Sequence, residues 1–147
     1  MADLAADPVA VRARLAAVPG ELATAARSAP SKPPSPGEWG PGEIVRHLIA
    51  VEELVWQVRL RQLETEGHPR WAWVEPGQWL GAPGAGLEDV LATHASARAS
   101  TLAMLDALGT DGWARTGTHD TFGVLDVAGL MEKALDHDDE HLASLRR

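Results

Sequence analysis

The chain of 147 residues contains no cysteine and no tyrosine, and only one phenylalanine. The absence of cysteine excludes disulfides, a catalytic thiol and thiolate metal ligands, so any bound metal must take its ligands from His, Asp or Glu. Ile is also sparse, whereas Ala and Leu supply most of the apolar residues. This balance favours helix over sheet.

Basic residues are few as well: 13 Lys and Arg stand against 21 Asp and Glu, which gives a formal net charge of -8. No basic cluster stands out, so we expect neither a nucleic-acid partner nor an anionic membrane surface. No apolar run approaches the roughly 20 residues that span a bilayer, and the N-terminus does not resemble a signal peptide. We therefore expect one cytoplasmic domain over residues 1–147.

Breaks rich in Pro, Gly or turn residues divide the chain into four amphipathic patterns with helical periodicity. The first begins at Asp7-Pro8, and the second runs from Pro41 to about Glu66-Gly67. The third covers Leu87 to Leu108, and the fourth extends from Asp126 almost to the C-terminus. Asp7 and Asp126 are the expected N-caps, and Pro19-Gly20 predicts a kink or a split in the first helix. The fold class predicted is an all-α four-helix bundle, whose topology the loop lengths leave open.

Two long connections, residues 68–86 and 110–125, are predicted to be loops. The first contains three of the six tryptophans, Trp71, Trp73 and Trp79. A loop of this length is usually functional or ordered by its own side chains. These rings are expected to cover a pocket, to form a dimer surface, or simply to pack within the loop. Trp39 and Trp56 are expected to pack near the second helix.

Three histidines are the candidate metal ligands. His137 and His141 are four residues apart and follow the apolar stripe of the last helix, so both imidazoles should face the bundle interior. His47 lies on or beside the inward stripe of the second helix and is the natural third ligand. Three neutral imidazoles suit zinc, nickel or ferrous iron, and leave a coordination position open for water or substrate.

The histidine pattern has a simpler interpretation, because one such pair arises readily by chance and an inward histidine is more often a hydrogen-bonded core residue. His94 also lies on an apolar stripe, where a core or pocket role is favoured over a fourth ligand position. His68 is expected to face solvent, and His119 is a candidate for the mouth of the site. If no metal binds, the histidines are core residues and candidate pH sensors.

Carboxylates near these histidines are candidates for orienting them. Glu43 precedes His47 by one turn, and Asp138 follows His137 directly. Asp138 also belongs to an acidic run, Asp136 to Glu140, for which a solvated helix face is the preferred interpretation.

Two segments resemble those of the DinB/YfiT-like superfamily of metalloproteins. One is Glu38-Trp39-Gly40-Pro41-Gly42-Glu43-Ile44-Val45-Arg46-His47-Leu48, and the other runs from Trp113 to Leu145, with Gly117-Thr118-His119-Asp120 and His137-Asp138-Asp139-Glu140-His141-Leu142. The resemblance implies a four-helix bundle in up-down-down-up order, with His47, His137 and His141 as metal ligands. It implies zinc or nickel as the usual metal, with iron or manganese as further alternatives, and a homodimer.

The same resemblance implies chemistry with a low-molecular-weight thiol in some relatives and hydrolysis in others. Transfer of a small thiol by a metal-dependent enzyme is therefore our first functional hypothesis, and hydrolysis is the second. A further alternative is a non-catalytic binding or stress-response module that the metal stabilises. The sequence contains no nucleophile elbow, phosphate-binding loop or dinucleotide fingerprint, so metal-centred chemistry is the chemistry it supports.

Overall fold

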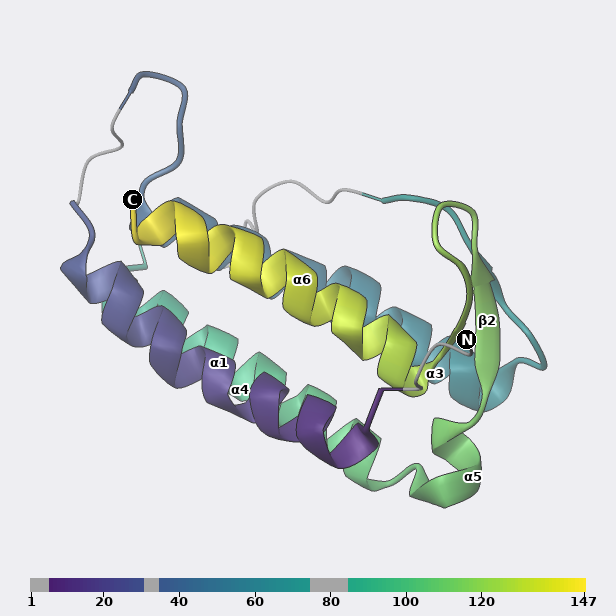
Figure 1. Ribbon diagram of the computed structural model, residues 1–147. Helices are drawn as coiled ribbons and strands as arrows, with labels where there is room; N and C mark the ends of the chain where they lie inside the picture. Colours follow the sequence, from purple (N-terminus) through teal and green to yellow (C-terminus); the bar gives the residue numbers. More distant parts are fainter. Residues whose placement is uncertain (1–5, 31–34, 75–84) are drawn as a thin grey trace.

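The computed structural model describes residues 6–30, 35–74 and 85–147. Four long helices form a bundle (Figure 1). They are α1 (Pro8–Ser28), the continuous second helix formed by α2 (Pro41–Val51), η1 (Glu52–Trp56) and α3 (Gln57–Thr65), then α4 (Leu87–Asp106) and α6 (Val127–Leu145). A short helix, α5 (Gly109–Trp113), follows α4. None of the helices in the described ranges has the length and hydropathy of a membrane span.

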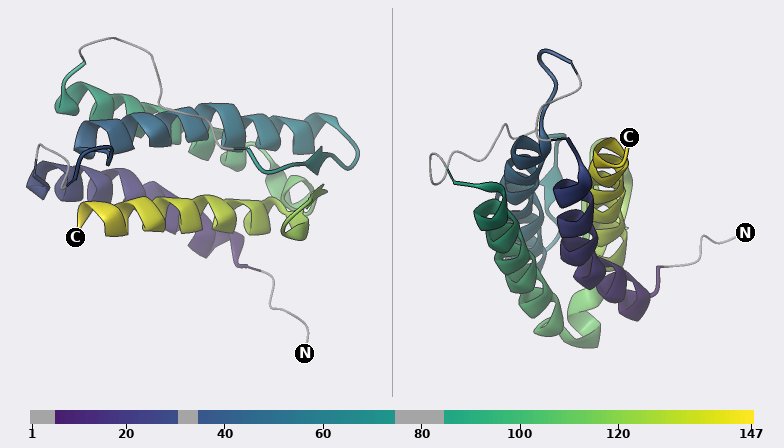
Figure 2. Two further views of the ribbon diagram at one scale, coloured as in Figure 1. Left: turned by 90° about the horizontal axis from the view of Figure 1, so that it is seen from above. Right: turned by 90° about the vertical axis from the view of Figure 1, so that its left-hand side faces the viewer.

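The helices run up, down, down and up, as the family resemblance implied. In Figure 1, α1 and α6 run in one direction, and the second helix and α4 run in the other. The end-on view of Figure 2 shows the four packed around a common interior. Because the second helix and α4 are parallel, the chain must return along the bundle between them, which requires a long connection.

Both expected N-caps are confirmed. The Asp7 carboxylate accepts from the N–H of Val9 at 3.0 Å, and the Asp126 carboxylate accepts from the N–H of Gly129 at 2.8 Å. The predicted split at Pro19-Gly20 is wrong, because α1 is continuous through both residues. Proline lacks the N–H that would bond to the carbonyl four residues earlier, so Pro19 leaves the Leu15 carbonyl without its helical donor.

The five residues of η1 form a π-helical segment in the middle of the second helix. Such a segment inserts a residue into the α-helical repeat and rotates the inward face that follows. An uninterrupted α-helical stripe through Leu48, Val51 and Val55 would continue at Val58. Val58 is instead half-buried, and Leu60 and Leu63 face the core. Glu52 and Arg59 are also buried by this rotated helix.

The prediction that the two long connections are loops is only partly correct, because segments of both pair into a small sheet. Strand β1 (Arg70–Trp71) runs parallel to β2 (Thr116–His119), which pairs antiparallel with β3 (Gly123–Asp126). Gly117 is needed where β2 passes Trp71, since a Cβ there would lie 2.5 Å from the indole ring. The sheet fixes His119 opposite Trp71 in the register. Trp79, also named above, lies outside the described residues.

The apolar core has two parts. One, at the end of the bundle near the sheet, includes Leu15, Val55, Leu105, Leu130 and Met131. The other includes Leu22, Ile49, Val90, Leu91 and Leu142. In sequence, the buried polar residues His94, Arg98, Thr101 and Asp138 fall between members of these two sets. Arg98 also hydrogen-bonds to the buried Glu52 of the second helix. The interior therefore contains a polar layer, and the candidate ligand His137 is adjacent in sequence to one of its residues, Asp138.

Candidate metal centre

The structure brings His47, His137 and His141 together, although 90 residues separate the first two. Each offers one ring nitrogen, and the three nitrogens lie within 4.8 Å of one another. The Nε2 atoms of His47 and His137 are 3.3 Å apart. His47 is buried, and the other two are half-buried. The two helices α2 and α6 thus converge on one point, as the spacing predicted.

The distance between His47 and His137 matches that of two ligands of one metal ion. Two nitrogen ligands at about 2.0–2.1 Å from a tetrahedral ion lie about 3.3 Å apart. The separation of the two Nε2 atoms, 3.3 Å, matches that edge. The donor set is all imidazole, which binds zinc, nickel and iron. Of the groups formed by described residues, this one can hold a metal, and it would contribute three ligands.

The surroundings of His137 keep this ring in the form that binds metals. Burial, followed by the nearby His141 and His47, lowers the pKa of His137 to about 4. The imidazole is therefore neutral at pH 7, and a neutral ring nitrogen is the ligand that a metal requires. The indole of Trp39 covers the group, with its ring centroid 4.8 Å from that of His47 and 6.4 Å from that of His141. The expected position of Trp39 near the second helix is confirmed.

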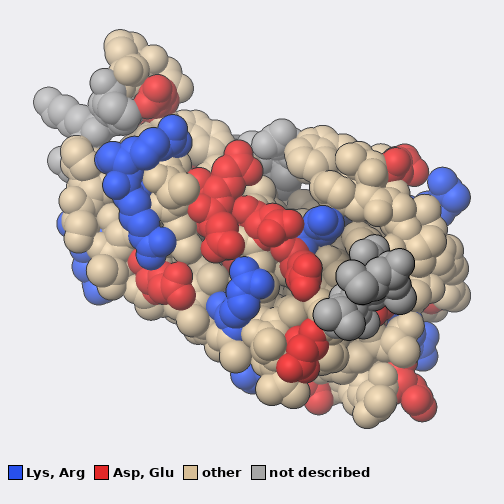
Figure 3. All heavy atoms as spheres, viewed as in Figure 1, with Lys and Arg blue, Asp and Glu red and all other residues tan. Residues whose placement is uncertain are grey.

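Asp138 is not on a solvated face, as preferred above, but 2% exposed in the polar layer. Its carboxylate accepts from Arg98 Nη2 at 2.8 Å, and Arg98 also makes two hydrogen bonds to Glu52, at 2.8 and 2.9 Å. The solvated-face interpretation was wrong for Asp138 because its buried arginine partner lies on another helix. The other acidic residues over α6, which Figure 3 shows on this face, are exposed: Glu132, Asp136, Asp139 and Glu140.

Arg98 completes the network through the Leu15 carbonyl, which accepts from its Nη1 at 2.9 Å. This is the carbonyl that Pro19 leaves without a helical donor. Arg98 therefore joins all four long helices: α4, which carries it, the second helix, α6 and α1. The two carboxylates share one cation, and their pKa values shift in opposite directions. Burial raises the pKa of Asp138 to about 7. Arg98 holds the pKa of Glu52 below its usual value in spite of burial.

The remaining histidines divide as the sequence suggested. His94 is 1% exposed in the core and does not join the three-histidine group. Neither of its ring nitrogens has a hydrogen-bond partner among the described residues. His68 is exposed and hydrogen-bonds to Thr116 and Thr118. The Glu43 carboxylate caps its own helix by accepting from the N–H of Gly40 at 3.3 Å, and its role in orienting His47 stays a prediction.

A cavity of about 280 Å³ opens beside the histidines and is lined by His47, His137 and His119. His119, the candidate for the mouth of the site, lines this cavity and is 2% exposed. Trp73, which is 60% exposed, also lines this cavity, whereas Trp71 is buried in the core. One of the loop tryptophans therefore covers a pocket, as expected, and another packs in the interior.

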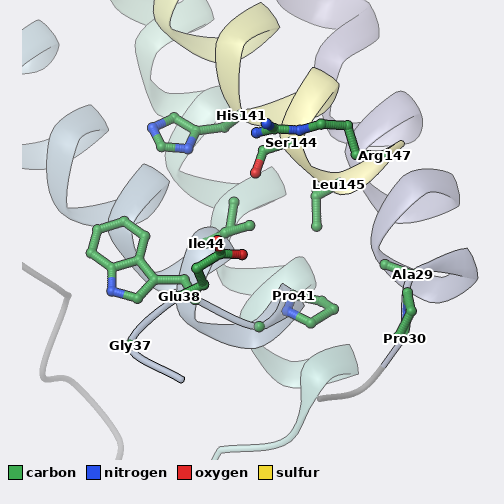
Figure 4. A pocket seen from close by; sticks show the side chains of 12 residues that line it. Ala29, Pro30, Gly37, Glu38, Pro41, Ile44, His141, Ser144, Leu145 and Arg147 are labelled. Atoms are coloured by element: carbon green, nitrogen blue, oxygen red, sulfur yellow. The ribbon is translucent and has the colours of Figure 1, made fainter. Parts of the chain in front are cut away.

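A second cavity, of about 590 Å³, is lined by His141, Ser144, Arg147 and Glu38. Figure 4 shows these side chains around it, with His141 above and Pro41 below. Different histidines of one group therefore line two different cavities. The group is accessible from both.

Sequence reasoning missed the buried charges Glu52, Arg59 and Arg98. A signal for two of them was present: Glu52 lies between Leu48 and Val55, and Arg98 follows His94 by four residues on an inward stripe. Charged residues are almost never fully buried unless they are paired, and the partner cannot be identified from one helix alone.

Comparisons with known proteins agree with this architecture. The family model described as the DinB superfamily matches residues 7–145. Among solved structures, YfiT from Bacillus subtilis is similar, with a TM-score of 0.65 and 20% sequence identity over 94% of this chain and 85% of that one. That protein is described as a probable metal-dependent hydrolase with an unusual four-helix bundle topology. No curated protein matches the chain.

Proposed function

This chain belongs to the DinB superfamily, and from that premise we propose that it is a metal-dependent enzyme whose ligands are His47, His137 and His141. The observation that carries the proposal is the convergence of three ring nitrogens within 4.8 Å beside an open cavity. A closed structural site would use four protein ligands, whereas three leave a position for water or substrate. A metal used for stability alone has no need of that opening.

His47, His137 and His141 would hold the divalent ion, which would lower the pKa of a bound water or thiol and so supply a nucleophile at neutral pH. The protein's own residues do the rest. His47 and His137 present their nitrogens at the cavity, and Trp39 covers the rings. Arg59 and His119 line the wall where a substrate would lie.

Hydrolysis is the reaction we place first, because the structural neighbour YfiT is described as a probable metal-dependent hydrolase. In hydrolysis, water adds to the substrate, the bond to the leaving group breaks, and the water protons end on the two products. Zinc or nickel is the metal we expect at an all-imidazole site.

Transfer of a small thiol is the second candidate, and the pair of cavities favours it. His141 lines one cavity, and His47 and His137 line the other. A thiol and an electrophile could therefore approach the same group from different sides. In that reaction the sulfur forms a bond to the electrophile, the leaving group departs with its electron pair, and the thiol proton goes to solvent.

The test uses zinc-loaded or nickel-loaded protein prepared without a histidine tag. It is assayed with p-nitrophenyl esters, and separately with a thiol and 1-chloro-2,4-dinitrobenzene. We expect turnover that stops on chelation and in His137→Ala, and that persists in His68→Ala, a variant of an exposed histidine. Absence of metal-dependent turnover with every substrate would favour the non-catalytic module instead.

A further inference from the structure

A buried cation lines the wall of the smaller cavity. Arg59 shares this cavity with His47 and His137, and is 6% exposed. Its Nη2 donates to the Ala72 carbonyl at 2.9 Å. The guanidinium carbon lies 5.6 Å from the ring centroid of Trp56 and 5.7 Å from that of Trp71, so aromatic rings hold the group in place.

Arg59 lacks the partners that Arg98 has. Within the described residues it forms no ion pair with a carboxylate, and the bond to Ala72 is its one hydrogen bond. Burial without a counter-charge holds the pKa of Arg59 below its usual value, although the group stays protonated at neutral pH. A desolvated cation is costly unless an anion offsets it. The remaining N–H groups of the guanidinium fork are suited to a carboxylate.

His119 adds a second donor to the same cavity. Its Nδ1 accepts from the backbone N–H of Thr121 at 2.9 Å, so the neutral ring carries its proton on Nε2. Burial and the nearby charge of Arg59 lower the pKa of His119, which keeps the ring neutral at pH 7. His119 therefore contributes an N–H donor to the lining of the cavity that also contains Arg59.

The rest of the wall is largely apolar: Val51, Val55, Trp56, Trp73, Val74 and Phe122. The other charges lie at the more exposed edge. Lys133 is 3.8 Å from Asp136 and lies over the Phe122 ring at 4.6 Å, and Glu140 is exposed. These groups are solvated or paired, whereas Arg59 is neither. A volume of about 280 Å³ limits the occupant to a small molecule.

We propose that this cavity binds a small organic anion, a carboxylate on an apolar body, with the carboxylate on Arg59 and His119. The apolar body would then pack against Trp73 and Phe122, and its other end would face His137. The inference rests on the proposed function, because it names the substrate class of that site. Recognition of the anion, however, depends on Arg59 and not on the metal.

The test compares two probes of similar shape, phenylacetate and its neutral amide, phenylacetamide. Binding to the metal-loaded protein is followed by calorimetry, with tryptophan fluorescence as a second signal, and is repeated after chelation. We expect phenylacetate to bind about ten-fold more tightly or better in both states. Arg59→Gln should abolish the preference, and Arg59→Lys should retain part of it, because lysine keeps the charge without the fork.

The matched control is Arg61→Gln, which removes an exposed arginine from the same helix and should leave the preference intact. Equal binding of the two probes by the wild-type protein overturns the proposal, whatever the variants do. A preference that survives Arg59→Gln and disappears on chelation also overturns it, because the carboxylate would then bind the metal.

The outcome is separable from that of the proposed function. A protein without turnover that still prefers phenylacetate contradicts the enzyme assignment and supports the anion site. Metal-dependent turnover without a preference for phenylacetate supports the enzyme assignment and contradicts the anion site.

Discussion

Two polar clusters lie side by side in the bundle, and adjacent residues of α6, His137 and Asp138, belong to one each. The Arg98 cluster is complete: its guanidinium reaches two carboxylates and a carbonyl, and its members are 1–2% exposed. The histidine cluster is open, with three ring nitrogens that converge and two cavities that reach its residues. The closed cluster is suited to holding the helices together, and the open one to binding.

The complete cluster should be the more sensitive to substitution. Arg98→Met removes the guanidinium that bridges Glu52 and Asp138 and leaves two buried carboxylates without their ion pair. We expect a loss of about 3–5 kcal/mol in the free energy of unfolding, measured with denaturant at pH 7. Arg12→Met breaks an exposed pair with Asp106 and should cost no more than about 1 kcal/mol. Equal losses of unfolding free energy in the two variants would contradict the stabilising role assigned to the buried Arg98 cluster.

His94 lies in the polar layer and has no hydrogen-bond partner in the described part of the chain. Its burial should make the stability of the fold depend on acid. Burial lowers its pKa from 6.5 to about 4, so between these values the unfolded chain takes up a proton that the folded protein does not. The stability associated with neutral His94 is complete above pH 6.5 and lost as the pH falls towards 4, by about 3 kcal/mol.

The measurement is the unfolding free energy of wild type and His94→Leu from pH 7.5 to 4. The leucine variant should be as stable as wild type at pH 7 or more so, because it buries no unpaired polar atom. Asp138, whose pKa is raised to about 7, opposes the histidine over this range, and the difference between the two proteins removes its contribution. A difference that does not change with pH would contradict the buried neutral histidine.

Metal removal should affect the open cluster alone. A metal at 100 times its dissociation constant stabilises the folded state by about 2.7 kcal/mol, if it binds the unfolded chain negligibly. Chelation should therefore lower the melting temperature of wild type and of His68→Ala, and leave that of His137→Ala unchanged. A chelator effect that persists in His137→Ala would place the metal elsewhere.

The sequence predicted the parts of the structure that depend on one helix at a time. The caps Asp7 and Asp126 and the inward face of His137 and His141 follow from local pattern. The sheet was missed because its strands are only 2–4 residues long, and their pairing joins segments far apart in the chain. Arg98 and Arg59 were missed for a similar reason, since each is buried by groups from other elements.

The rotation of the second helix is another limit of local pattern. Val58 continues an ideal helical stripe, but the π-helical turn at Glu52–Trp56 shifts the face by part of a turn. A periodicity argument assumes one repeat along the helix and cannot detect that shift. Glu52, at the start of this turn, is one of the two carboxylates that pair with Arg98.

The most direct test of the three-histidine site is the metal content of protein made without a histidine tag, measured by inductively coupled plasma mass spectrometry after reconstitution and desalting. We predict about one divalent ion per chain in wild type and in His68→Ala. His137→Ala should retain far less. Wild-type protein with well under one ion per chain, or His137→Ala with full metal content, would contradict the account.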